Sequence, residues 1–288
     1  MMKFFYALIS LIVLAAHAQA QIRIGGSDLL EPNFAESLAE YAASAEIELQ
    51  VDFKGSYPAL RDLKRGDLDL AIVAIPDNQE VPEGSFRSVN IASKVLTIAV
   101  PSENPLNQVT INQLWAIFGD AEGTTRWGEL GLTGEWGQRS IVVHSVSRSD
   151  HTLAVDLFSH HVLSTGRMKA TTIELPNIEE IRLALAEDVA GIALLDRMPA
   201  DTRGLKILPV ARRETDFAHD PTPEAVSSAD YPLRLPLYIV FPTERASDLK
   251  DLLQFMVSSD AAQALGADGL TPRARQHRDQ LQLEFERF

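Results

Sequence analysis

Two Gly-Ser steps, Gly26-Ser27 and Gly55-Ser56, each stand between a strand-like run and a helix-like run of this 288-residue chain. The second helix-like run leads to residues 69–75, which carry apolar side chains on both faces of the strand that they predict. A strand without a polar face is typical of a central parallel strand that is covered on both sides. The order strand, helix, strand, helix, strand therefore predicts an α/β fold.

Each Gly-Ser step also predicts a position that favours an anion. A turn that opens a helix leaves main-chain N–H groups without acceptors at the positive end of the helix dipole, and the serine adds a hydroxyl. Serine before a helix is usually an N-cap, and for Ser56 the same geometry serves both roles. For Ser27 the neighbouring Asp28 is a rival cap. Anion capture and helix capping stay open as alternatives at both serines.

The first twenty residues have the pattern of a secretory signal peptide. Lys3 gives a basic start, residues 4–16 are apolar, and residues 18–20 read Ala-Gln-Ala, a small-x-small cleavage motif. A transmembrane anchor is the weaker alternative, because spanning a bilayer takes about 20 apolar residues. The chain has no cysteine, so no lipid can be attached at the cleavage site. We expect a periplasmic or secreted protein that begins at Gln21.

Composition predicts a folded protein with a small partner. Removal of the signal peptide leaves 268 residues, enough for one large or two medium domains. The formal net charge of −14, without basic runs, disfavours nucleic acid and anionic membranes as partners. A small anion is compatible with this charge, because local dipoles bind it and salt screens the remaining field beyond about 10 Å.

A second α/β unit is predicted after residue 96. Expected strands cover residues 96–100, 141–143, 191–195 and 235–241, and expected helices cover residues 114–118, 153–163, 178–186 and a closing pair within 249–265. The polar, proline-containing stretch 212–230 predicts a loop. Two lobes joined by crossing strands, near 96–101 and 235–241, fit this order.

Signals of an enzyme are weak. The chain has no cysteine nucleophile, no G-x-S-x-G, no G-x-x-x-x-G-K and no H-E-x-x-H. His160 and His161 are adjacent, so on a helix they point about 100° apart and cannot both face one metal ion. A solvated helix face is the prediction for this pair. We expect no catalysis, no cofactor and no metal site, with a hydrolase as the weakest hypothesis.

Several motifs carry a family resemblance. Residues 109–119 read VTINQLWAIFG, residues 126–130 read RWGEL, residues 231–240 read YPLRLPLYIV and residues 268–272 read DGLTP. With these segments the chain resembles the phosphate-binding periplasmic proteins of ABC transporters over its whole mature length. The resemblance implies a two-lobed type 2 periplasmic binding protein, or venus flytrap, with two crossing hinge strands. It implies lobe I at residues 21–97 and 239–288 and lobe II at residues 98–238.

The resemblance also implies a ligand set in the cleft between the lobes. Carried over to this sequence, the ligand-binding residues are Ser27 and Asp28 in the first loop, Ser56 in the second loop, and Arg148, Ser149, Asp150 and Thr152 in the third loop. The implied ligand is phosphate or a related oxyanion. The implied partner is an ABC transporter permease, and the implied oligomeric state is a monomer.

One departure from the family pattern affects the ligand. After the central strand the family carries a serine and an aspartate, and this chain has Val73 and Ala74. A buried carboxylate that accepts a ligand proton would select protonated phosphate, because an unpaired buried polar group costs about 1–3 kcal/mol. The alternative to phosphate transport is a drifted family member that acts as a sensor or interaction protein of the cell envelope.

Overall fold

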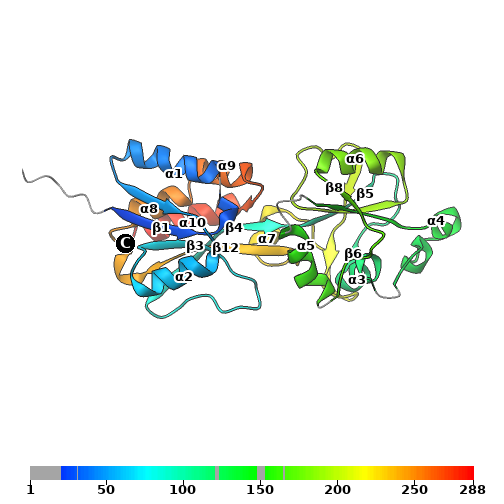
Figure 1. The fold of residues 1–288 in the computed structure, drawn as a ribbon, viewed down its shortest axis with the longest axis horizontal. Helices are drawn as coiled ribbons and strands as arrows, with labels where there is room; N and C mark the ends of the chain where they lie inside the picture. The colour runs from blue at the N-terminus through cyan, green and yellow to red at the C-terminus, as the bar shows by residue number, and fades with distance from the viewer. Residues whose placement is uncertain (1–20, 31, 121–122, 148–152, 165) are drawn as a thin grey trace, which may run out of the picture.

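The computed structural model describes residues 21–30, 32–120, 123–147, 153–164 and 166–288. They form two lobes that lie end to end along the longest axis of the molecule (Figure 1). We call the part around the six-stranded sheet lobe I and the part around the five-stranded sheet lobe II. The predicted two-lobed α/β fold is confirmed. The predicted signal peptide, residues 1–20, lies outside the described residues, among which no helix is long and apolar enough to span a membrane.

Lobe I is a mixed sheet with helices on both faces. Its strand order is β13-β4-β12-β3-β1-β2. Its strands are β1 (Ile22–Gly26), β2 (Leu49–Asp52), β3 (Leu70–Ala74), β4 (Phe86–Val95), β12 (Arg234–Pro242) and β13 (Thr271–Pro272). Its helices are α1 (Asn33–Ser44), α2 (Ser56–Arg65), α8 (Lys250–Met256), α9 (Ser259–Ala267) and α10 (Arg275–Phe285). Helix α2 covers one face, and the other helices cover the opposite face.

The local sequence explains where α2 begins and ends and why β3 is buried. Helix α2 starts after Gly55 and ends at Gly66, whose φ of 80° is left-handed and favours glycine. Strand β3 is central and buried, as expected, and pairs in parallel with β1. Its other neighbour, β12, is antiparallel, so the expectation of a purely parallel strand is wrong on that side. Strand β12, in which the chain returns from lobe II to lobe I, lies beside β3 on that side.

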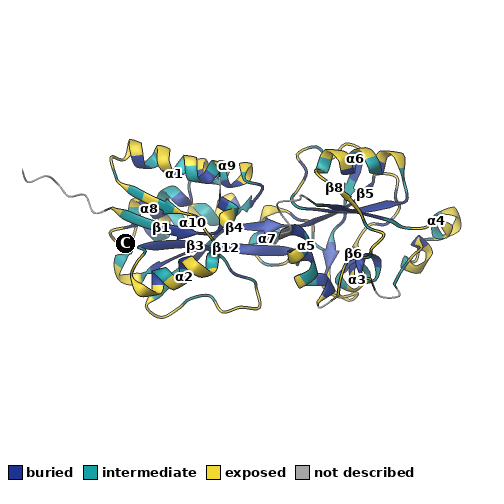
Figure 2. Ribbon diagram, in the orientation of Figure 1, coloured by how far each residue is buried: buried dark blue, intermediate teal, exposed yellow. Residues whose placement is uncertain are grey.

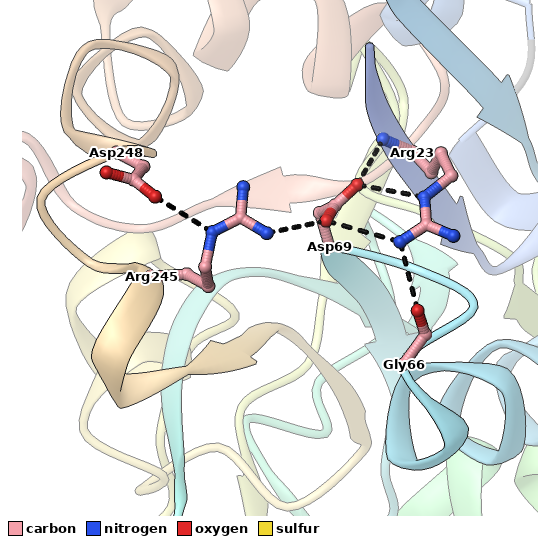
Figure 3. A network of polar contacts seen from close by, with 5 residues as sticks. All are labelled: Arg23, Gly66, Asp69, Arg245 and Asp248. Carbon is pink, nitrogen blue, oxygen red and sulfur yellow. Dashed lines mark hydrogen bonds and ion pairs between the residues drawn. The ribbon is translucent and has the colours of Figure 1, made fainter. Parts of the chain in front are cut away.

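A buried ion-pair network ties the N-terminal end of β3 to the rest of lobe I (Figure 3). The Asp69 side chain is 8% exposed. One carboxylate oxygen accepts hydrogen bonds from the main-chain N–H and the Nε of Arg23, at 2.9 and 3.1 Å. The other accepts from Nη1 of Arg245 at 2.8 Å, and Arg245 also binds Asp248. The network therefore joins β1, β3 and the turn that follows β12.

Lobe II is a smaller sheet with the order β10-β5-β9-β7-β8 and an additional pair, β11-β6. Its strands are β5 (Thr97–Pro101), β6 (Val109–Thr110), β7 (Val142–Val146), β8 (Ile173–Leu175), β9 (Gly191–Leu195), β10 (Leu205–Ile207) and β11 (Val210–Ala211). Its helices are α3 (Ile111–Phe118), α4 (Gly134–Gln138), α5 (Leu153–Phe158), α6 (Ile178–Glu187) and α7 (Pro223–Ser227). A π-helical turn, Ser159–Leu163, continues α5.

Strands β4 and β12 connect the lobes. In both strands the side chains change from one hydrophobic core to the other within a few residues. Ala92 and Leu237 belong to the core of lobe I, whereas Val95 and Leu235 belong to that of lobe II. Figure 2 shows both strands buried where they leave lobe I. The lobe boundaries at 97/98 and 238/239 stay a prediction, and we propose that the hinge lies where the cores change.

Several elements differ from the sequence prediction. Strand β4 has no predicted counterpart, and helix α7 lies inside the predicted loop 212–230. The predicted helix pair within 249–265 is present as α8 and α9, and the unpredicted helix α10 follows it. Strand β4 is hard to recognise because its pairing with β12 is irregular: Asn90 pairs with Tyr238 and Ala92 with the adjacent Leu237. The extra residue interrupts the alternation of period two.

Candidate functional site

Three loops of lobe I meet at the carboxyl ends of the parallel strands β1, β2 and β3. The main-chain N–H of Gly55 donates to the carbonyl of Gly26 at 2.8 Å. The N–H of Ala74 donates to the Ser56 hydroxyl oxygen at 2.9 Å. Loops after the carboxyl ends of neighbouring strands are where α/β proteins bind ligands. The two Gly-Ser steps and the end of β3 therefore form one continuous surface.

Glycine is required at two of these positions. A Cβ atom on Gly26 would lie 2.6 Å from the carbonyl oxygen of Ile72 and 2.9 Å from the ring of Phe53. Gly55 has a φ of 126°, which side chains rarely allow. The close approach of β1 to β3 and the entry into α2 both depend on the absence of a side chain.

Ser56 offers donors to an anion. Its hydroxyl oxygen accepts from Ala74, so the hydroxyl hydrogen remains available to a ligand within the described part of the chain. The main-chain N–H groups of Ser56 and Tyr57 lie in the first turn of α2, where no intrahelical acceptor exists. Pro58 has no N–H. The start of α2 thus presents one hydroxyl and two main-chain donors.

The first Gly-Ser step opens a single 3-10 turn, Asp28–Leu30, and not the α-helix that the sequence predicts. Helix α1 begins at Asn33, six residues after Ser27, and its first N–H groups are already occupied. The carboxylate of Asp268 accepts from the N–H groups of Asn33 and Phe34, each at 3.0 Å. The expectation of a free helix start here is wrong, because a residue more than 230 positions away caps it.

Ser27 and Asp28 belong to a tight turn. Ser27 is 3% exposed, and its N–H donates to Ile72. Its hydroxyl accepts from the N–H of Leu29 at 3.3 Å and lies 3.4 Å from the Asp28 carboxylate. Asp28 is exposed. Ser27 is thus engaged in its own turn, and its role as a ligand stays a prediction.

The predicted third loop lies outside the described residues. This applies to Arg148, Ser149, Asp150 and Thr152, so their ligand roles stay predictions. The flanks are described: β7 ends at Val146, and α5 begins six residues after Ser147 with Leu153–Phe158. A strand therefore precedes the loop and a helix follows it.

Sequence reasoning missed an ion pair beside the three loops. Arg234 is 6% exposed, and its Nη2 donates to the Asp77 carboxylate at 2.7 Å. Asp77 follows Ala74 by three positions. The sequence signal that could have indicated this ion pair is Arg234 itself, a charged residue at the start of the apolar run 234–242.

The adjacent histidines His160 and His161 lie in different environments. His160 is exposed, as predicted, whereas Nε2 of His161 is buried without a hydrogen-bond partner among the described residues. Burial is the main cause that lowers the pKa of His161, and the main chain of Arg234 forms a hydrogen bond with its ring. The prediction of a solvated face is wrong for His161. In the described ranges no group of three or more His, Asp or Glu side chains is placed to hold a metal ion.

A comparison with protein-family models identifies the family of this chain. Residues 14–260 match the PBP superfamily domain. The chain belongs to the PBP superfamily. This family match covers both lobes and the three loops of lobe I, and it confirms the resemblance inferred from the sequence motifs.

Relatives of this PBP-superfamily chain carry names that refer to phosphate. The phosphate-binding protein PstS of Pseudomonas aeruginosa is 25% identical over 196 residues, which cover 64% of this chain and 59% of PstS. The chain thus matches less than two thirds of the length of that relative. PstS from Borrelia burgdorferi superimposes with a TM-score of 0.71 at 17% identity and covers 88% of this chain and 99% of its own.

A possible phosphate binding protein from Planctomyces limnophilus gives a TM-score of 0.69 at 15% identity, over 93% of this chain and 98% of its own. At these identities the two solved structures establish the fold alone.

Proposed function

We propose that the protein is an extracytoplasmic solute-binding protein that captures an inorganic oxyanion, with phosphate as the ligand, for an ABC importer. The observation that carries the proposal is the convergence of Gly26, Ser56 and Ala74 at the carboxyl edge of the parallel strands. The family and the phosphate-binding name of the curated relative support it. In this proposal the protein acts as a monomeric binding protein and not as an enzyme.

On the side of lobe I, the proposed anion is held by neutral donors. The Ser56 hydroxyl and the first-turn N–H groups of α2 bind it, at the positive end of the helix dipole. The loop with Arg148, Ser149, Asp150 and Thr152 would add the positive charge from lobe II, where it follows a strand and precedes a helix. Ser27 and Asp28 line the proposed site from the first loop. Binding from both lobes closes the cleft by a hinge motion.

Calorimetry on the purified chain 21–288 tests which anion the protein binds. Phosphate, sulfate and molybdate are titrated separately. We expect one phosphate site per chain. A ligand at 100 times its Kd should stabilise the protein by about 2.7 kcal/mol, so a rise in Tm gives a second readout. If none of the three anions produces heat or raises Tm, the drifted sensor or interaction protein becomes the better hypothesis.

The pH dependence of phosphate affinity tests the composition of the site. Val73 and Ala74 supply no carboxylate that could accept a ligand proton. Phosphate affinity should therefore fall little, or rise, between about pH 6 and 8, as phosphate loses its second proton. Calorimetry at three pH values measures this trend. A strong loss of affinity with rising pH would contradict it and would indicate a carboxylate acceptor elsewhere in the site, with Asp77 as the first candidate.

Export should leave a defined N-terminus. If residues 18–20 form the cleavage motif, the exported protein begins at Gln21, with or without cyclisation. Intact-mass spectrometry of the periplasmic or secreted fraction measures this. Recovery of a chain that retains Lys3 in the membrane fraction would contradict the proposed localisation.

A further inference from the structure

The connection between the lobes narrows to two strands over a short stretch. Strand β13 pairs with β4 only at Ser93 and Ala92, and β3 pairs with β12 from Leu237 onward, followed by one hydrogen bond from the N–H of Ile75 to the carbonyl of Pro236. Lys94 and Val95 of β4 therefore pair with Leu235 and Arg234 of β12 alone. A two-stranded ribbon bends more easily than a sheet with further strands on both sides. We place the bending point of the hinge at this stretch.

Each strand of this ribbon carries one buried cation. Lys94 is 8% exposed and Arg234 is 6% exposed. Arg234 pairs directly with Val95, and Lys94 pairs with Leu235. Directly paired residues share a face of a ribbon, and successive residues alternate between faces. Lys94 and Arg234 therefore point to opposite faces of the hinge.

Arg234 contacts both lobes on the face that α2 covers. On β12 it lies on the same face as Val240, which packs in the cluster that contains Ala59 and Leu63 of α2. Its Nη2 donates to Asp77, in the lobe I loop that follows β3, at 2.7 Å. Its Nη1 donates to the carbonyl of Val226 in α7 of lobe II at 3.1 Å.

Lys94 contacts both lobes on the opposite face. Its Nζ lies 3.9 Å from the Asp196 carboxylate, which follows β9 of lobe II. The same Nζ lies 3.5 Å from the carbonyl of Gly269, which follows α9 of lobe I. Arg197 packs against Gly269 as well, since its Nη1 would be 2.8 Å from a Cβ atom there. A hydrogen bond from the N–H of Ala274 to the Ser227 hydroxyl also joins the lobes.

We propose that Lys94 and Arg234 are positioning residues that set the angle between the two lobes. Each side chain binds both lobes on its own face of the ribbon, and we call its contacts a brace. Each cation draws the lobes together on its own face of the ribbon. Loss of one brace lets the ribbon bend toward the face that keeps its brace. Because the angle determines the fraction of closed molecules, both residues should tune ligand affinity without touching the ligand. The proposal goes beyond the identity of the ligand and does not depend on it.

Distance measurements between the lobes test this directly. Helices α1 and α6 lie on the same side of the molecule, at the top of Figure 1, away from α2. The chain has no cysteine, so Glu40→Cys on α1 and Glu180→Cys on α6, both exposed, give two defined spin-label sites. Pulsed electron spin resonance without any added anion then reports the separation of the lobes on the Lys94 face.

The two variants should move this distance in opposite directions. Lys94→Met removes the brace on the labelled side and should lengthen it, whereas Arg234→Met should shorten it, each by on the order of a few ångströms. Arg234→Lys keeps the charge and should restore the original distance. The controls are Lys64→Met and Arg203→Met, which change exposed cations within a single lobe and should leave the distance unchanged.

Shifts in the same direction, or no shift in two folded variants, would overturn the proposal. Circular dichroism checks folding. If Arg234→Met does not fold, Asp77→Ala removes the same contact at a side chain that is 36% exposed, and it should shorten the distance as well. Failure of phosphate to bind would refute the proposed function and leave these distances unaffected, so the two proposals fail separately.

Discussion

Replacement of Arg148 by alanine should weaken phosphate binding by on the order of 2–4 kcal/mol, about 30- to 900-fold in Kd. Among the residues proposed as ligands, Arg148 alone can give a charge-assisted, two-pronged hydrogen bond to a tetrahedral anion. Without it the anion is held by the dipoles and hydroxyls of lobe I. Calorimetry with phosphate, at constant pH and salt, measures the difference.

Matched variants make the Arg148 experiment specific. Ser56→Ala removes one neutral hydrogen bond and should cost only about 0.5–1.5 kcal/mol of binding free energy. Arg167→Ala changes an exposed arginine of lobe II and should leave the affinity unchanged. A phosphate affinity that Arg148→Ala does not alter would place the anion elsewhere. The drifted sensor or interaction protein would then become the better hypothesis.

Asp69→Asn should lower the free energy of unfolding by about 2–3 kcal/mol. The carboxylate is nearly buried, and it accepts hydrogen bonds from two arginines, Arg23 and Arg245 (Figure 3). Asparagine keeps the shape but removes the counter-charge of Arg23 and leaves Arg245 with Asp248 alone. The loss stays below that of a fully buried pair, because the two arginine side chains are 38% and 35% exposed and regain water. Urea unfolding of the wild type and the variant at pH 7 measures the difference.

The pH dependence provides an independent check on Asp69. Burial is the largest single influence and raises its pKa, but the hydrogen bonds and charges of Arg23 and Arg245 outweigh it and hold the pKa below its ordinary value. A carboxylate with a lowered pKa stabilises the fold above its unfolded pKa of about 4 and loses that contribution as the pH falls through its folded pKa. The variant should lack this part of the acid dependence.

A surface pair serves as the control for the Asp69 experiment. Asp62 binds Arg61 at 2.9 Å, and its side chain is 34% exposed, compared with 8% for Asp69. Asp62→Asn should leave Tm unchanged, because exposed ion pairs contribute little. Equal effects of Asp62→Asn and Asp69→Asn would contradict the argument that burial makes the Asp69 network important.

Elements with strong local signals agree with the sequence prediction. Helix α2 lies between Gly55 and Gly66, and β9 covers residues 191–195, as expected. Both depend on neighbours in sequence: turn chemistry for the helix and an uninterrupted apolar run for the strand. Strand β4 lacked such a signal, because its irregular pairing at residues 90–92 breaks the alternation. The order of the predicted elements indicated two lobes joined by crossing strands, and the family motifs then assigned this arrangement to the type 2 periplasmic binding proteins.

In the candidate site, too, some features follow from the local sequence and others from the tertiary structure alone. The sequence alone determined that Ser56 opens a helix after a strand, because glycine and serine encode that turn locally. Only the tertiary structure decided that Asp268 caps α1, across more than 230 positions, and that Arg234 meets Asp77 across 157. Such pairs form when the chain returns from lobe II and adds β12 beside β3. No spacing or periodicity in the sequence records that contact, because it depends on the register between strands that lie far apart in the chain.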